Sequence, residues 1–277
     1  MKRSLKQIIL RNCTKNYLRE YEEGKMTHAV DAVFLGDYVS SEIIINGLFE
    51  YRELAFLAHE LFPHLPRGSI ALDIGANIGN HACFFANHFK RVVAFEPNPM
   101  AATLLRLNSR SCRIEVVQKG LSDTRATLNF SINRQNIGGS MITDANSDIE
   151  VEVERLDSLA DSLSLHDVSF VKIDVEGHED KVLAGASETL SKYSPVIAME
   201  GFYKKDVEKG EHVSRLLREM GYENFYALSK TPKFRALTLS GLSKLLKRRS
   251  LALEPIESLA GRDHNLAIIS KKPIHPR

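Results

Sequence analysis

The sequence predicts an α/β fold built on a doubly wound, mostly parallel sheet with helices on both faces. Three observations predict it. Short apolar strands such as 70–74 and 92–95 alternate with segments of helical periodicity. The links between these segments are short, which is typical of βαβ units. The first strand also runs into the turn Asp73-Ile-Gly75-Ala-Asn-Ile-Gly79, where a strand, a tight turn and the start of a helix follow one another.

The elements follow in order along the chain. Residues 1–66 are expected to form an N-terminal helical extension, whose clearest element is a helix over 51–62 that Pro63 ends. We expect this helix to pack at the edge of the sheet; the alternative is that it helps to close a cofactor site, with Glu53 as its polar residue. Residues 67–277 then form the main domain around a seven-stranded, Rossmann-like sheet. Its strands are predicted at 70–74, 92–95, 114–117, 168–173, 195–199, 225–228 and 265–269, the last one antiparallel, with helices at 81–89, 99–108, after Gly177 and at 211–220.

Two insertions interrupt the α/β alternation. In the segment 125–156, apolar residues alternate with polar ones on two arms, which predicts a half-exposed β-hairpin. Its loop, 136–140, is either an ordinary hairpin loop or a flap over the strand ends on the substrate side. The segment 230–262 begins with seven Lys or Arg and no acid between 230 and 250, and Leu239, Leu242 and Leu246 would line a short helix there. It is either a solvated insertion or a basic amphipathic lid that meets an anionic substrate or a membrane surface.

The glycine turn and the next acid predict the cofactor. A dinucleotide site has the pattern G-x-G-x-x-G, but here Asn77 stands where a glycine would let a pyrophosphate approach. S-adenosylmethionine carries no phosphate and suits this turn better. Glu96 ends the second strand 23 positions after Asp73, close to the ~20 that separate such a turn from a ribose-binding acid. We therefore expect Glu96 to bind the ribose; a solvent-exposed acid before Pro97 is the alternative.

A second group of polar residues follows the fourth strand. Because this strand is expected beside the first one, Asp174 should emerge next to the reactive end of the cofactor. Asp174 is the first candidate for a base or an acceptor-orienting group, with Glu176, His178 and Glu200 behind it. Clustered carboxylates are also ligands for Mg²⁺, but their spacing does not require a metal, so no metal ligand is assigned.

Four blocks of sequence together resemble the FkbM-type family of class I, S-adenosylmethionine-dependent methyltransferases. They are Asp73–Asn80, Glu96-Pro97-Asn98, Leu121-Ser122-Asp123 and Lys172–Glu179, within a resemblance that covers about residues 42–200. This family is associated with O-methylation of sugars and of polyketide-type natural products. The resemblance implies that 67–277 is a class I methyltransferase domain and implies a set of cofactor-binding residues: Asp73, Gly75, Ala76, Asn77, Gly79, Asn80, Glu96, Pro97, Asn98, Ser122 and Asp174.

The predicted function is therefore O-methylation of a hydroxyl on a sugar, a glycan or a natural product. A nicotinamide-dependent oxidoreductase and a non-catalytic binding module that retains the fold are the alternatives. Nucleic acid is not expected as a partner, because 37 basic and 35 acidic residues nearly balance and no aromatic platform accompanies the basic run. Three cysteines without CxxC spacing, and no apolar run of ~18 residues, predict a cytoplasmic enzyme. The sequence specifies neither the acceptor nor the oligomeric state.

Overall fold

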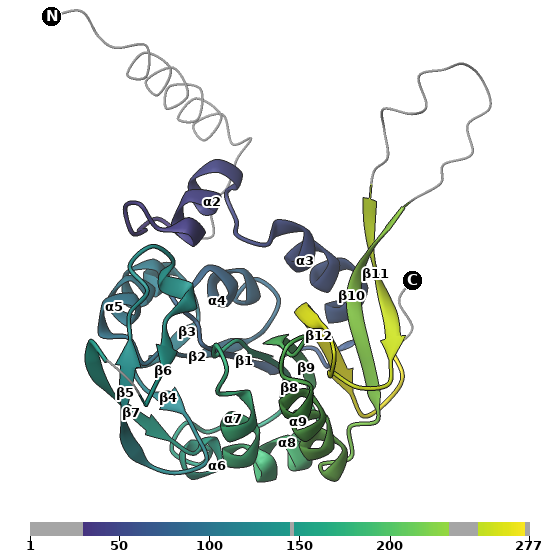
Figure 1. The fold of residues 1–277 in the computed structure, drawn as a ribbon. Coiled ribbons are helices and arrows are strands. Elements are labelled where there is room, and N and C mark those ends of the chain that lie inside the picture. The colour runs from purple at the N-terminus through teal and green to yellow at the C-terminus, as the bar shows by residue number, and fades with distance from the viewer. Residues whose placement is uncertain (1–29, 145–146, 233–248, 275–277) are drawn as a thin grey trace, which may run out of the picture.

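The computed structural model describes residues 30–144, 147–232 and 249–274, and in these ranges it shows a mixed sheet with helices on both faces (Figure 1). A smaller sheet lies beside it. The large sheet has eight strands in the order β11-β10-β12-β9-β8-β1-β2-β3. In chain order they are β1 (Ile70–Ile74), β2 (Arg91–Phe95), β3 (Ile114–Val117), β8 (Val168–Ile173), β9 (Val196–Phe202), β10 (Asn224–Pro232), β11 (Arg249–Ile256) and β12 (Asp263–Ser270).

The five strands from β3 to β9 are parallel, while β12, β10 and β11 continue the sheet in antiparallel pairing. The predicted mixed, mostly parallel architecture is confirmed, but the predicted number of seven strands is wrong. The eighth is β11, which lies in the segment that we assigned to a basic insertion. Its Leu251 and Leu253 are only half-buried, and Pro255 lacks an N–H, as is usual for an edge strand. Such a strand gives a weak sequence pattern.

Helices cover both faces of the large sheet. The strand β1 is buried on both sides, with Leu72 and Ile74 in one hydrophobic cluster and Ala71 in the other, as expected for a central parallel strand. The first cluster is completed by α6 (Leu156–Leu159), α7 (Glu179–Gly185), α8 (Ser187–Tyr193) and α9 (Val207–Glu219). The second is completed by α3 (Tyr51–Phe56), the π-helix η1 (Leu57–Leu61), the 3₁₀-helix η2 (Phe62–His64), α4 (Asn80–Phe85) and α5 (Pro99–Asn108), which the 3₁₀-helix η3 (Ser109–Ser111) follows.

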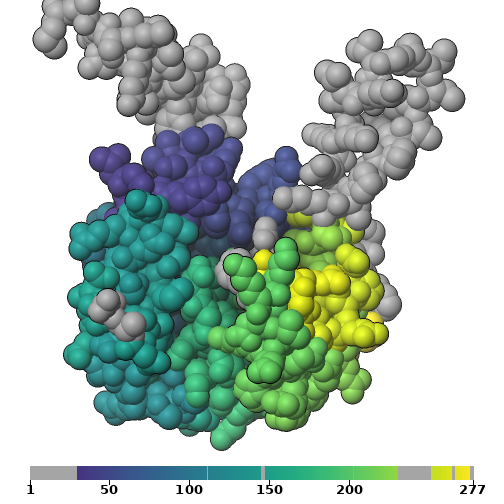
Figure 2. Space-filling view, in the orientation of Figure 1, coloured from purple at the N-terminus to yellow at the C-terminus, as the bar shows by residue number. Residues whose placement is uncertain are grey.

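The N-terminal segment is part of this core. Leu54, Leu57 and Leu61 are buried over the face of the sheet, whereas we expected this helix at the sheet edge. Before it, α2 (Tyr38–Asn46) is held to the hairpin region by Asp37. One carboxylate oxygen of Asp37 accepts from Ser40 N and the other from Ile137 N, both at 2.8 Å. In the space-filling view the purple α2 segment accordingly lies against the teal part of the molecule (Figure 2).

The smaller sheet contains the predicted hairpin. Its four strands have the order β4-β7-β5-β6, and the antiparallel pairing of Leu128 with Val151 confirms the pairing that the alternation predicted. Their bounds are β4 (Gly120–Leu121), β5 (Ala126–Ser131), β6 (Met141–Ile142) and β7 (Ile149–Glu154), with the 3₁₀-helix η4 (Ile137–Gly139) in the connecting loop.

Two further predictions concern the basic segment and the membrane. The short helix expected around Leu239, Leu242 and Leu246 lies outside the described residues. Within the described ranges, none of the helices combines the length and the apolar character that crossing a membrane requires.

Candidate functional site

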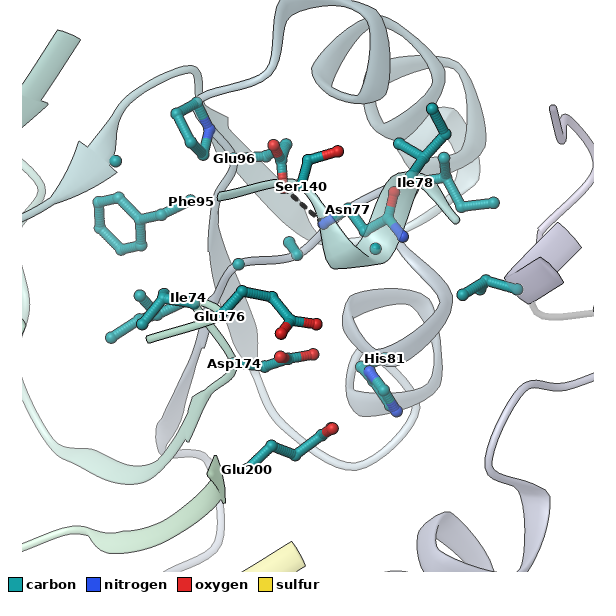
Figure 3. Close-up of a pocket in the computed structure, with 18 of the residues that line it drawn as sticks. Ile74, Asn77, Ile78, His81, Phe95, Glu96, Ser140, Asp174, Glu176 and Glu200 are labelled. Carbon is teal, nitrogen blue, oxygen red and sulfur yellow. Dashed lines mark hydrogen bonds between the residues drawn. The ribbon is translucent and has the colours of Figure 1, made fainter. Parts of the chain in front are cut away.

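A pocket opens at the carboxyl ends of β1, β2, β8 and β9, where ligands bind in open α/β sheets. Its floor is the turn after β1, and its walls include residues of α2 and of the hairpin loop. Figure 3 shows Asp174, Glu176, Glu200 and His81 directed into one common space, with Glu96 and Asn77 next to it. Residues of the loop at 136–140 also line the pocket, so this loop reaches the strand ends, and its role as a flap on the substrate side stays a prediction.

Gly75 of the glycine turn is required both by its backbone conformation and by the close approach of a neighbouring strand. Gly75 has φ +80°, and a Cβ there would lie 1.8 Å from the backbone oxygen of Asp174. The glycine is therefore needed because β1 and the end of β8 approach closely. Gly75 N and Ala76 N both donate to Phe95 O at 3.0 Å, so these two N–H groups bind the neighbouring strand.

Glu96 is a buried carboxylate at the pocket wall. Its two oxygens accept hydrogen bonds from Asn77 N and Asn98 N, each at 2.8 Å. Burial raises the pKa of Glu96 to about 7, although both of these bonds favour the charged form. Because each carboxylate oxygen can accept a second bond, both retain capacity for a ligand hydroxyl. Glu96 is only 6% exposed, so the alternative of a solvent-exposed acid is wrong.

Lys172 lies beneath the pocket among three carboxylates. Its Nζ is 2.9 Å from Asp174 Oδ2 and 3.9 Å from Glu200 Oε1. Burial disfavours the ammonium form, but Asp174, Asp73 and Glu200 outweigh it and raise the pKa of Lys172. For the acids Asp73 and Glu200, burial disfavours the charged form and therefore raises the pKa. Lys172 was not among the predicted site residues; the available signal was a lysine within an otherwise apolar, fully buried strand.

Glu176 and His178 follow β8. Glu176 has a left-handed backbone, with φ 49°, and burial followed by repulsion from Asp174 raises its pKa to about 7. His178 is the N-cap residue of α7, where its Nε2 lies 2.9 Å from Ser122 Oγ. Burial lowers the pKa of His178. The two side chains therefore differ in their partners. Among the described residues the Glu176 carboxylate has no ion-pair partner and faces the pocket beside other acids, whereas His178 forms a hydrogen bond with Ser122.

Most of the predicted site residues come together in this pocket. Those that line it are Gly75, Ala76, Asn77, Asn80, Glu96, Pro97, Asp174, Glu176, His178 and Glu200. Those that lie behind the lining are Asp73, Gly79, Asn98 and Ser122. Asn98 caps α5 by accepting from Met100 N. Glu200 lies within β9 rather than after its end, because this strand continues to Phe202.

The walls of the pocket were not predicted. Tyr38 and Phe49 line it, whereas Glu53, which we had selected in that segment, does not. His81 also lines it, and its Nε2 lies 3.1 Å from Glu50 Oε2. Position 81 immediately follows the glycine turn, which was an available signal. Nothing in the local pattern around 38–49 indicated that this segment reaches the strand ends.

Three buried oxygen atoms of the lining have no hydrogen-bond partner within the described structure: Asn77 Oδ1, Asn136 Oδ1 and Glu200 Oε1. Behind them, both carboxylate oxygens of Asp73 are also without one. Buried acceptors of this kind are expected to bind a donor from a ligand or water. Among the described residues, no group of three or more His, Cys, Asp or Glu side chains has an arrangement that could hold a metal ion.

Comparisons with known proteins identify the family. Residues 73–223, which are 151 of the 277, match the model of the methyltransferase FkbM domain. Hexuronic acid methyltransferase AglP of Haloferax volcanii is 33% identical over 141 residues, 50% of this chain and 59% of the relative. The 2-O-methyltransferase NoeI of Sinorhizobium fredii is 28% identical over 144 residues, 44% of this chain and 59% of the relative. The matches thus span about three fifths of these two relatives.

A crystal structure of methyltransferase FkbM from Methylobacillus flagellatus aligns with 22% identity and a TM-score of 0.36, over 48% of this chain and 32% of that one. The family model, in contrast, covers more than half of this chain and includes the glycine turn, Glu96 and the acids after β8. The chain belongs to the FkbM methyltransferase family.

Proposed function

We propose that the chain is an S-adenosylmethionine-dependent O-methyltransferase that acts on a hydroxyl of a sugar or glycan. The observation that carries the proposal is the buried Glu96 carboxylate, which lines the pocket at the end of β2 and retains one acceptor position on each oxygen. Membership of a methyltransferase family supports it. The names of two relatives, a hexuronic acid methyltransferase and a 2-O-methyltransferase, support a sugar hydroxyl as acceptor.

The turn after β1 fits a cofactor without phosphates. Gly75 N and Ala76 N donate to Phe95 O, Asn77 N donates to Glu96, and Gly79 N donates to Ala76 O. A pyrophosphate bound here would need such N–H groups as donors, and these four already have acceptors within the protein. This arrangement argues against the nicotinamide alternative.

The residues present fit S-adenosylmethionine. Glu96 would accept the ribose hydroxyls, and the unpartnered Asn77 Oδ1 would accept a donor from the same ligand. When bound, the cofactor supplies an electrophilic methyl group. The chain itself then has to hold the acceptor hydroxyl and to remove its proton.

Three carboxylates are available for that task. Asp174 is fixed by its ion pair with Lys172, and we assign to it the orientation of the acceptor hydroxyl. Glu176 lines the same pocket, and its pKa of about 7 is close to the value at which a general base works best near neutral pH. We therefore assign proton removal to Glu176, with Glu200 as a further acceptor-binding group.

Calorimetric titration tests the cofactor. We expect S-adenosylmethionine and S-adenosylhomocysteine to bind and NAD not to bind. Replacing Glu96 by Ala should weaken S-adenosylmethionine binding by about 1–3 kcal/mol, the scale of lost hydrogen bonds to a charged group. The matched control is Glu115→Ala, which removes a glutamate of β3 that pairs with Arg91. Binding of NAD alone would overturn the proposal, and unchanged affinity of Glu96→Ala would place the ribose elsewhere.

Turnover distinguishes an enzyme from a binding module. Transfer of a labelled methyl group to a panel of sugars and glycans is expected with the wild-type protein. Asp174→Asn should lower turnover far more than cofactor affinity, because an amide cannot keep the ion pair with Lys172. Cofactor binding without transfer to any hydroxylated acceptor would favour the non-catalytic alternative.

A further inference from the structure

We propose that the acceptor is a sugar without an anionic group, either neutral or bearing an ammonium, and that uronic acids and sugar phosphates are rejected. This inference rests on the proposed function, whose acceptor class it narrows. The relative AglP is named as a hexuronic acid methyltransferase, so the acceptor proposed for this chain differs in charge from the acceptor in that name.

The first observation is the imbalance of charge around the pocket. Four carboxylates line it, on Glu96, Asp174, Glu176 and Glu200. Among the described residues of the lining, Lys172 is the single Lys or Arg; the remaining basic side chains are His81 and His178. Because Lys172 is paired with Asp174, each further carboxyl group of the lining that ionises gives the pocket a net negative charge, and this charge opposes an anionic substrate in a low-dielectric space.

The one lysine is also occupied. The side chain of Lys172 is 3% exposed, and its Nζ pairs with Asp174 and approaches Glu200. A carboxylate on a substrate would have to displace one of these partners, which are fixed on β9 and at the end of β8. The histidines are engaged too, His81 with Glu50 and His178 with Ser122.

The second observation concerns hydrogen bonding and is independent of net charge. Within the described structure, the unpartnered buried atoms of the lining that are not assigned to the cofactor, Asn136 Oδ1 and Glu200 Oε1, are both acceptors. Acceptors need donors, and a hydroxyl or an ammonium placed beside them supplies one, whereas a carboxylate in the same position supplies none. Asn136 belongs to the hairpin loop and Glu200 to β9, so two separate elements of the pocket lining each present an acceptor that needs a donor.

Crowding of the carboxylates supports the same conclusion. Repulsion from Asp174, added to burial, raises the pKa of both Glu176 and Glu200. The acids of the pocket therefore already disfavour one another, and a further negative charge would increase that repulsion. A positively charged ring relieves this repulsion, and a neutral ring does not add to it.

The first test measures the charge of the pocket directly, without cofactor or acceptor. Ser140 lines the pocket (Figure 3), and Ser140→Cys places a thiol there. The rate at which this thiol is modified by an ammonium-bearing methanethiosulfonate is compared with its rate of modification by a sulfonate-bearing one. Peptide-resolved mass spectrometry distinguishes labelling of the thiol introduced at position 140 from labelling of the native cysteines. The control is Ser162→Cys on the surface, where the neighbouring Asp161 is also exposed.

For each introduced cysteine we divide the modification rate with the ammonium reagent by the rate with the sulfonate reagent. We expect this ratio to be at least tenfold higher at position 140 than at position 162. Adding Glu176→Gln or Glu200→Gln should reduce this ratio, whereas Glu188→Gln on the exposed surface of α8 should not. Equal ratios at both cysteines, or a ratio at position 140 that Glu176→Gln and Glu200→Gln leave unchanged, would overturn the proposal.

The second test uses matched sugars with the wild-type protein and S-adenosylmethionine. Methyl glycosides of glucose, galactose and mannose are compared with their 6-carboxylates and with glucosamine. We expect each uronate to have a kcat/KM at least tenfold below that of its neutral counterpart, and equal or better transfer to uronates would overturn the proposal. A high labelling ratio without transfer to any sugar would support the charge selection and overturn the sugar acceptor, so the two failures are distinguishable.

Discussion

Glu176 combines a left-handed backbone, a place in the pocket lining and a carboxyl group of raised pKa. Residues held in such a sparsely populated conformation are frequent at functional sites. Because its pKa is raised to about 7, Glu176 is protonated below that pH and ionised above it. Only the ionised form accepts a proton from a hydroxyl.

We therefore expect kcat/KM for methyl transfer to rise with pH and to level off above about 7. Glu176→Gln should lower kcat and abolish this rise, with S-adenosylmethionine affinity unchanged. A pH–rate profile of both proteins provides the measurement. A Glu176→Gln enzyme that keeps the same inflection near pH 7 would assign the base to another group.

The individual residues of the site were predictable to different degrees. Glu96 and Asp174 were predicted because each follows an apolar strand, and parallel strands end at one edge of the sheet. Lys172 was missed because the partners that make a buried lysine favourable, Asp73 and Glu200, lie on two other strands. This part of the compensation depends on strand order in space, so the local sequence shows only a lysine within an apolar strand, with Asp174 two residues after it.

Gly75 provides a test at the scale of secondary-structure elements, because it allows β1 and β8 to approach. We expect Gly75→Ala to destabilise the fold by more than about 4 kcal/mol, since the new Cβ would overlap the Asp174 carbonyl. Gly68→Ala is the matched control: Gly68 has a similar φ, +77°, but open space around it. It should cost about 1–2 kcal/mol, the strain of a left-handed alanine. Urea unfolding measures both, and equal costs would contradict the close-approach explanation.

Asp37 connects two elements that are distant in sequence, α2 and η4. Replacing it by Ala removes hydrogen bonds to Ser40 N and Ile137 N and should cost about 1–3 kcal/mol. Because both elements line the pocket, kcat/KM should also fall by about tenfold. Asp206→Ala is the control, since Asp206 caps α9, which contributes no lining residue. If both variants lose stability and activity alike, the pocket does not depend on the α2 contact.

Among the elements, β1, β3 and α5 have the predicted bounds, because apolar runs and a Pro99 start define them sharply. The helix predicted over 81–89 is shorter, since α4 ends at Phe85. The segment 51–62 changes from α-helix to π-helix and then 3₁₀-helix, which leucine spacing alone does not reveal. The strand β11 was the least predictable, because it lies at the edge of the sheet and its leucines are only half-buried.

Considered as a whole, the molecule extends its core beyond the region that matches the family. Leu54, Leu57 and Leu61 cover one face of the sheet, although they precede residue 73. We therefore expect a fragment of residues 67–277 to expose this apolar face and to lose cooperative unfolding. Differential scanning calorimetry of the fragment and of the full chain is the measurement. A fragment that unfolds cooperatively at the temperature of the full chain would show that residues 1–66 are separable.

The position of β12 has a consequence for synthesis on the ribosome. This strand lies between β9 and β10, yet it begins 61 residues after β9 ends, at Asp263 against Phe202. At translation rates of about 5–20 residues per second, roughly 3–12 s pass between the synthesis of the end of β9 and that of the start of β12. During that interval the edge of β9 has unpaired backbone groups, which favour pairing with other chains. Nascent chains of this protein should therefore need protection by chaperones until the last strand emerges.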